Sequence, residues 1–106
     1  LVDYAWHGDI GGTTQPVGRK LPSRFGLYDV LGNVWELCGD FWSDVLPGGS
    51  VIDPVGPSSG SSHVMRGGTW RSSGQDCRAA VRRSAIHDDY NYVSFGFRVV
   101  LASDPP

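Results

Sequence analysis

The sequence predicts a small α+β domain with a short antiparallel sheet, one short helix and much irregular structure. The chain has 106 residues, the length of one ordinary domain. Its 15 Gly and 7 Pro residues favour a loop-rich fold with little helix. Short stretches of alternating apolar and polar residues, separated by such breakers, are typical of strands. We therefore treat residues 1–106 as a single domain whose core is built largely from aromatic side chains.

The first forty residues contain a lead-in, a helix signal and a strand signal. Residues 1–25 hold Gly-Gly and Xaa-Pro breakers and no sustained periodicity, which predicts an irregular surface segment. Residues 23–31 place three apolar side chains at helical spacing after a serine, and Gly32 follows them. This pattern predicts the short helix. Residues 33–42 then alternate apolar with acidic side chains, which predicts a strand with one apolar face.

The second half alternates predicted strands with irregular segments. Residues 44–62 are rich in Gly, Pro and Ser and predict a long surface loop. Three further strands are predicted at 63–70, 77–83 and 95–102. The segments between them, 71–76 and 84–94, have neither the helical nor the strand period and are expected to be exposed.

Charge and cysteine content exclude several classes of protein. The net charge is −2, with 9 basic and 11 acidic residues, so no basic surface for nucleic acid is expected. No apolar run approaches the roughly 20 residues of a membrane span, and a soluble chain without a signal peptide is expected, its compartment being unknown. Cys38 and Cys77 lack zinc-site spacing; the sequence leaves a disulfide undecided and favours two buried free thiols.

Four short motifs carry a resemblance to a known family. They are GLYD at 26–29, GNVWE at 32–36, RGGTW at 66–70 and GFR at 96–98. In this order and spacing they resemble the formylglycine-generating enzyme (sulfatase-modifying factor) family. The resemblance implies a C-type-lectin-like fold. A full family domain is longer, and this chain looks like its carboxyl-terminal half, as a minimal version or as a piece of a larger domain.

The motif residues are expected to specify the fold. We expect Trp35, Trp70 and Phe97 to be buried together, because apolar positions on a strand face usually pack. The arginines of two motifs, Arg66 and Arg98, are expected to pair with Asp29, with Asp40 or with backbone carbonyls rather than with a ligand.

The resemblance speaks against catalysis. The family's oxidase chemistry uses two cysteines, and the resemblance places their positions on Ser72 and Cys77. The alternative is that Cys77 opens the CRSANR-like strand of non-catalytic members and does not correspond to a catalytic cysteine. A serine hydroxyl cannot replace a thiolate in copper binding or dithiol chemistry, so no copper and no catalytic residue are expected. The three histidines, His7, His63 and His87, lie in distant segments and form no recognisable catalytic motif. The alternative is a fragment of a formylglycine-generating oxidase or a catalytically silent paralogue.

A subset of the family serves as variable proteins of diversity-generating retroelements, which keep the motifs and vary the segments between them. In these systems the adenines of AAT and AAC codons in a template copy are mutated. Such mutations cannot yield Trp, Gln, Lys, Glu or Met, and positions 81 and 83–95 contain none of these residues. The resemblance therefore implies a binding face at 71–74 and 81–94 for an unknown protein or glycan, displayed at a surface through another segment or partner. Its candidate residues are Arg71, Ser72, Ser73, Gly74, Val81, Arg83, Ile86, His87, Asp88, Asp89, Tyr90, Asn91, Tyr92 and Ser94.

A structural calcium ion is the second implication of the resemblance. In catalytic members the GLYN and GNxWE segments hold calcium, and the matching positions here are Asp29, Gly32, Val34 and Glu36. Two carboxylates and two backbone carbonyls are the hard oxygen ligands that calcium prefers. The alternative is that Asp29 and Glu36 are buried, hydrogen-bonded structural acids.

Overall fold

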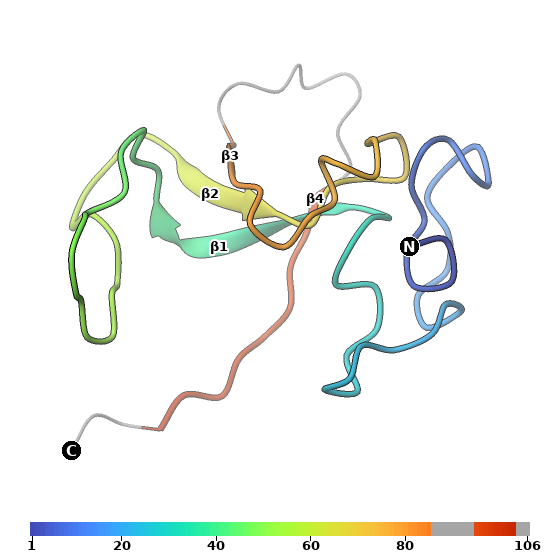
Figure 1. The fold of residues 1–106 in the computed structure, drawn as a ribbon, viewed down its shortest axis with the longest axis horizontal. Helices are drawn as coiled ribbons and strands as arrows, with labels where there is room; N and C mark the ends of the chain where they lie inside the picture. Colours follow the sequence, from blue (N-terminus) through green and yellow to red (C-terminus); the bar gives the residue numbers. More distant parts are fainter. Residues whose placement is uncertain (86–94, 104–106) are drawn as a thin grey trace.

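The computed structural model describes residues 1–85 and 95–103, and its regular structure is one four-stranded sheet (Figure 1). The strands are β1 (Trp35–Phe41), β2 (His63–Arg66), β3 (Arg83–Ser84) and β4 (Phe95–Gly96). Long irregular segments before β1 and between β1 and β2 make up most of the rest. Within the described part no helix is long and apolar enough to cross a membrane.

The sheet has the order β3-β2-β1-β4. The β1–β2 and β2–β3 pairs are antiparallel, as predicted, and the register of the first pair places Glu36 opposite Arg66. The register shifts between Leu37 and Phe41, which marks a bulge or irregularity in β1. The prediction of an antiparallel sheet is wrong for β4, which runs parallel to β1 and places Phe95 beside Trp35. The strands β3 and β4, which follow each other in the sequence, therefore lie at opposite edges of the sheet.

The core is small and centres on β2. The fully or nearly fully buried apolar residues are Ala5, Trp35, Val64, Met65 and Cys77. Val64 and Met65 are neighbours in β2, and successive strand residues point to opposite faces of a sheet. Both faces of the sheet are therefore covered at β2. By contrast Leu37, two residues after Trp35 on β1, is exposed.

The predicted helix over 23–31 is wrong, because this segment forms turns and bends. The Ser23 amide N–H donates to the Leu27 carbonyl at 2.8 Å, the reverse of the direction in a helix. Gly26 and Asp29 have positive φ angles of 76° and 53°, which a right-handed helix does not accommodate. The apolar residues thus have helical spacing, but the backbone turns instead.

Three of the predicted strands are shorter than expected. The strand predicted at 63–70 ends at Arg66, because Gly67 and Gly68 take φ angles of 95° and 78° and turn the chain. Of the strand predicted at 77–83, only Arg83 lies in a strand, as the first residue of β3. A hydrogen bond from the Val81 N–H to the Arg78 carbonyl closes a turn just before β3. The strand predicted at 95–102 retains its first two residues as β4.

The predicted cluster of Trp35, Trp70 and Phe97 does not form. Trp35 is 6% exposed and lies in the core, whereas Phe97 is 79% exposed. Trp70 is half-buried, and the Arg71 guanidinium lies 5.4 Å from the centre of its ring system. Phe97 is exposed because the chain leaves the sheet directly after Gly96 (Figure 1). The expected exposure of 84–94 is wrong at Ser84, which is buried, and residues 86–94 lie outside the described part.

Gly32 is the point where the amino-terminal segment meets the sheet. Its φ is 76°, and a Cβ atom at this position would lie 2.2 Å from the carbonyl oxygen of Trp6. The Gly32 N–H donates to the Gly67 carbonyl at 2.7 Å, and the Asn33 N–H donates to the Trp6 carbonyl at 2.8 Å. A residue without a side chain is therefore required by both conformation and space.

We predict that Gly32→Ala destabilises the protein much more than Gly26→Ala. Both glycines have a φ of 76°, so each substitution costs about 1–2 kcal/mol in the left-handed region. Gly26 has open space around it, whereas the new methyl at Gly32 collides with Trp6 backbone and adds roughly another 1–3 kcal/mol. Urea unfolding of the two variants measures the difference, and equal losses of stability would contradict the close approach.

Candidate ligand-binding face

The 71–74 part of the predicted binding face lies in two consecutive turns that follow β2. The Ser72 N–H donates to the Thr69 carbonyl at 3.1 Å, closing the first turn. The Asp76 and Cys77 N–H groups both donate to the Ser73 carbonyl, at 3.0 and 3.2 Å, closing the second. These local hydrogen bonds fix the backbone of 69–77 without a helix or strand.

A polar network joins these turns to β3. The Ser73 hydroxyl donates to Asp76 Oδ2 at 2.8 Å, and Arg83 Nη2 donates to Asp76 Oδ1 at 3.1 Å. The hydrogen bond from Ser73, followed by that from Arg83, lowers the pKa of the Asp76 carboxyl, which is therefore ionised at neutral pH. The structure thus brings the two sequence stretches predicted as one binding face side by side at this point.

The amino-terminal segment borders this surface, which the sequence did not reveal. The Gly8 N–H donates to the Ser72 carbonyl at 2.8 Å, and the Asp9 N–H donates to the Trp70 carbonyl at 2.9 Å. Asp9 also forms an exposed ion pair with Arg71, with 3.7 Å between Oδ1 and Nε. We call the surface formed by residues 8–9, 71–76 and 81–83 the turn face. No pattern in residues 1–25 signals this contact, since it joins positions more than sixty residues apart.

The predicted binding residues differ in exposure. Arg71, Ser73 and Arg83 are exposed, whereas Ser72, Gly74 and Val81 are half-buried. The predicted residues Ile86, His87, Asp88, Asp89, Tyr90, Asn91, Tyr92 and Ser94 lie outside the described residues. Binding by all of these positions stays a prediction.

The Ser72 hydroxyl is used inside its own turn. Ser72 Oγ accepts the Thr69 N–H at 2.9 Å and lies 3.2 Å from the Thr69 hydroxyl. It also faces Gly68, where a Cβ atom would lie 3.3 Å from Ser72 Oγ. Serine at this position therefore has a structural role in the first turn.

Cys77 lies on the other side of Gly68. A Cβ atom at Gly68 would be 2.7 Å from Cys77 Sγ, so Ser72 and Cys77, which the resemblance matched to the family's cysteine pair, both lie beside this glycine. Both cysteines are free thiols, as favoured, but only Cys77 is fully buried; Cys38 is half-buried, so the expectation of two buried thiols is wrong for Cys38. Burial raises the pKa of the Cys77 thiol, and the nearby Asp76 charge raises it further. A buried, protonated thiol is a poor nucleophile and a poor metal ligand.

The structure shows the surroundings of the two carboxylates among the four predicted calcium ligands. Asp29 is buried; its Oδ2 accepts the Gly18 N–H at 2.7 Å, and its Oδ1 has no hydrogen-bond partner in the part of the chain that the structure describes. An unpartnered buried carboxylate oxygen suits a cation. Among the described residues no group of three His, Cys, Asp or Glu side chains that could hold a metal ion is present, so a calcium ion here would rely on backbone carbonyls as well, as predicted.

Glu36 is already paired with a cation from the chain itself. Arg98 donates from Nε to Glu36 Oε2 at 2.6 Å and from Nη2 to Glu36 Oε1. The same Nη2 donates to the carbonyls of Tyr28 and Asp29 at 3.1 and 3.3 Å. The hydrogen bond with Glu36 raises the pKa of the Arg98 guanidinium. Calcium at Asp29, Gly32, Val34 and Glu36 stays a prediction, and it requires Glu36 to exchange this partner.

The arginine contacts follow the expectation only in part. Arg66 donates from Nη1 to the Ala79 carbonyl at 2.9 Å, as a backbone partner was expected. Arg98 also contacts carbonyls, but its carboxylate is Glu36 rather than the expected Asp29 or Asp40. Glu36 and Arg98 are 62 positions apart, so no local pattern connects them.

Comparison with known proteins places this arrangement in one family. Residues 1–103 match the family described as the sulfatase-modifying factor enzyme 1-like domain. The chain belongs to this family. It is similar to the formylglycine-generating enzyme of Thermomonospora curvata, with 36% identity over 105 residues that cover 92% of this chain and 34% of that enzyme.

Two solved structures share the fold of this sulfatase-modifying-factor domain. Treponema denticola variable protein 1 aligns with a TM-score of 0.72 and 43% identity, covering 79% of this chain and 31% of that one. PvdO from Pseudomonas aeruginosa aligns with a TM-score of 0.66 and 29% identity, covering 80% of this chain and 34% of that one. The chain therefore spans about a third of the length of these relatives. Both an enzyme and a variable protein are among them.

We predict that Ser72→Ala lowers stability by about 1–3 kcal/mol, because it leaves the Thr69 N–H without its hydrogen-bond acceptor. Ser73→Ala is the matched control: the Ser73 hydroxyl bonds at an exposed position, and its loss costs about 0.5 kcal/mol or less. Urea unfolding compares the variants. An Ser72→Ala protein as stable as Ser73→Ala would show that the first turn does not depend on this hydroxyl.

For calcium, we predict that added Ca²⁺ raises the melting temperature and that a chelator reverses the rise, since an ion that binds the folded state stabilises it by mass action. Asp29→Asn should remove this response, whereas Asp53→Asn, in the exposed 44–57 loop, should leave it intact. Melting curves that do not respond to Ca²⁺ or chelator would contradict the calcium site.

Proposed function

We propose that this domain is a non-catalytic variable protein of a diversity-generating retroelement, which presents the turn face and the 84–94 segment to another macromolecule. The observation that carries the proposal is the 43% identity to Treponema denticola variable protein 1 at a TM-score of 0.72. Identity to the formylglycine-generating enzyme of Thermomonospora curvata is 36%. The structural likeness thus favours a variable binding protein over a formylglycine-generating enzyme.

The chemistry around Gly68 supports the absence of catalysis. The first cysteine position holds Ser72, whose hydroxyl accepts the Thr69 N–H, and the second holds Cys77, which is fully buried. Dithiol chemistry and copper binding need two accessible sulfur atoms with thiolate character. This pair offers one sulfur, held protonated by burial.

The arrangement of the turn face supports a display role. Its exposed side chains Arg71, Ser73 and Arg83 extend from backbone fixed by turn hydrogen bonds and by the edge strand β3. Adaptable polar side chains on a fixed backbone are typical of binding surfaces. In this proposal Tyr90 and Tyr92 act as the aromatic anchors for a protein or glycan partner, because a few aromatic residues usually carry most interface energy.

Sequencing the gene and its neighbourhood tests the proposal. We expect a near-identical copy of the coding stretch close to a reverse-transcriptase gene, differing from it at adenines, with the differences falling in codons for 71–74 and 81–94. The motif codons 66–70 and 96–98 serve as the internal control and should be unchanged. Two results would contradict the proposal: no such copy near the gene, or differences between gene and copy that are spread evenly over motif and loop codons.

The second candidate function is formylglycine generation, favoured by the similarity to the Thermomonospora curvata enzyme over 92% of this chain. An assay that oxidises a cysteine-containing peptide in the presence of copper separates the two functions, with that enzyme as the positive control. We expect no turnover by this protein. Turnover that disappears in Cys77→Ser but persists in Cys38→Ser would establish the enzymatic function instead.

A further inference from the structure

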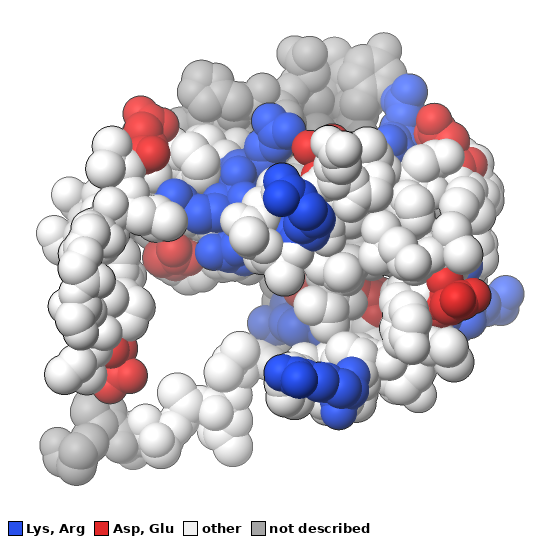
Figure 2. Space-filling model, viewed as in Figure 1, with Lys and Arg blue, Asp and Glu red and all other residues white. Residues whose placement is uncertain are grey.

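Residues 66–85 concentrate the positive charge of the chain. This stretch holds five arginines and one acidic residue, whereas the whole chain has a net charge of −2. The other residues together are therefore acidic, and the positive charge of this stretch does not follow from the overall composition. Figure 2 shows blue side chains gathered over β2 and β3 on one face of the molecule. We call Arg66, Arg78, Arg82 and Arg83 the arginine patch.

A turn at 78–81 brings the four side chains of the arginine patch together. A backbone hydrogen bond of 3.0 Å between the two ends of the turn closes it. Arg66, from the neighbouring strand β2, donates from Nη1 to the Ala79 carbonyl at 2.9 Å and so lies against the same turn. Arg82 and Arg83 follow the turn directly, and Arg83 is the first residue of β3. One short stretch of backbone and the strand beside it thus carry all four guanidinium groups.

The exposed arginines of the patch are oriented by contacts of their own and keep donors for a ligand. Arg78 donates from Nε to the Gln75 carbonyl at 2.9 Å, and Arg83 donates from Nη2 to Asp76 Oδ1 at 3.1 Å. An arginine has several further N–H donors, which these contacts leave unused within the described residues. Asp76 is the only carboxylate in the described part of the chain that forms an ion pair with the patch. Side chains that are already held in place lose less conformational freedom when they bind.

The chemistry of the arginine patch favours a partner that carries carboxylates. A planar guanidinium group matches a carboxylate, with which it can form two parallel hydrogen bonds. Several guanidinium groups at one place also attract an acidic partner from a distance and repel a basic one. The patch therefore fits a ligand with several acidic groups close together.

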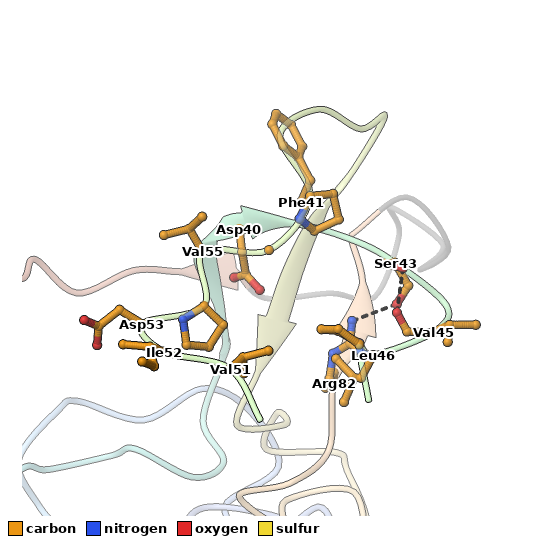
Figure 3. A pocket seen from close by; sticks show the side chains of 14 residues that line it. Asp40, Phe41, Ser43, Val45, Leu46, Val51, Ile52, Asp53, Val55 and Arg82 are labelled. Carbon is orange, nitrogen blue, oxygen red and sulfur yellow. Dashed lines mark hydrogen bonds between the residues drawn. The ribbon is translucent and has the colours of Figure 1, made fainter. Parts of the chain in front are cut away.

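Arg82 connects the patch to an apolar cavity. It lies at the wall of a cavity of about 550 Å³, which the 44–57 loop and the end of β1 enclose (Figure 3). Its Nη2 donates to the Ser43 carbonyl at 2.8 Å, and its guanidinium lies 4.5 Å from the centre of the Trp42 ring. Much of the remaining wall is aliphatic and includes Leu46 and Ile52. A polypeptide offers carboxylates and aliphatic side chains at neighbouring positions, whereas an acidic glycan has no comparable aliphatic group.

We propose that the arginine patch binds an acidic peptide segment of a partner protein. Asp or Glu side chains of the segment bind Arg78 and Arg83, and a neighbouring aliphatic side chain enters the cavity beside Arg82. The patch overlaps the turn face at Arg82 and Arg83. The inference therefore rests on the proposed function and deepens it by naming the chemistry of the partner.

The test measures the binding of a fluorescein-labelled peptide with several glutamates and one leucine to the whole chain, by fluorescence anisotropy. We expect saturable binding that weakens as salt is added, because salt screens exposed charge pairs. The same peptide with glutamine in place of every glutamate should bind about tenfold more weakly. With serine in place of leucine, it should bind about threefold more weakly, since the cavity then buries less apolar surface.

Variants of the chain locate the binding site. Arg78→Gln combined with Arg83→Gln should weaken binding of the glutamate peptide about tenfold. The matched control is Arg19→Gln combined with Arg24→Gln, because both arginines are exposed in the amino-terminal segment and their loss changes the net charge equally. Melting curves show whether each double variant folds. The glutamine and serine peptides test the proposal on the unchanged chain even where a variant does not fold.

Five results would overturn the proposal. They are equal binding of the glutamate and glutamine peptides, equal binding of the leucine and serine peptides, an equal effect of the two double variants, tighter binding of a sulfated oligosaccharide with the same charge, and peptide binding that appears only after Asp88→Asn and Asp89→Asn. The last result would mean that the chain's own aspartates compete for the patch. Comparison of the gene with its copy tests the proposed function separately: adenine-directed differences without peptide binding would reject this partner and leave the display function standing.

Discussion

The close approach of Gly32 to the Trp6 backbone is the contact on which the rest of the structure depends. It allows three chain segments to meet: the Asn33 N–H donates to Trp6, the Gly32 N–H to Gly67, and the Trp70 N–H to the Asn33 carbonyl. The Asn33 side chain adds two hydrogen bonds to the backbone of Gln15. With a small apolar core, the protein relies on backbone hydrogen bonds of this kind to fix its irregular segments.

The turn face is a consequence of this junction. Once Trp6 is held at Gly32, the next residues lie along the stretch that follows β2, and Gly8 and Asp9 hydrogen-bond with 70–72. The turns at 69–77 are then supported on one side by the amino-terminal segment and on the other by β3 through Asp76 and Arg83. Exposed side chains that make no such contact can vary on this surface with little effect on the fold, whereas the hydroxyl of Ser72 and the carboxylate of Asp76 are part of the hydrogen bonding that holds the turns.

The proposed lack of catalysis depends on two side chains that meet at one glycine. A Cβ atom at Gly68 would lie 2.7 Å from Cys77 Sγ and 3.3 Å from Ser72 Oγ. The Ser72 hydroxyl is engaged by Thr69, and burial raises the pKa of the Cys77 thiol. In the proposed function, these two side chains account for a shared fold without the oxidase chemistry.

The sequence by itself determined a strand within 33–42, the long 44–62 loop and the family, because a period of two and the Gly-containing motifs report local backbone directly. Only the tertiary structure decided that 23–31 forms turns, since Gly26 and Asp29 adopt left-handed backbone that apolar spacing does not reveal. It also decided the pairing of Arg98 with Glu36 and the place of Asp9 beside Trp70. These contacts join residues some sixty positions apart, and their partners are set by the path of the chain in space rather than by any local pattern. The exposure of Phe97 has the same origin: its apolar side chain predicts burial, but whether a packing surface lies opposite depends on what surrounds β4.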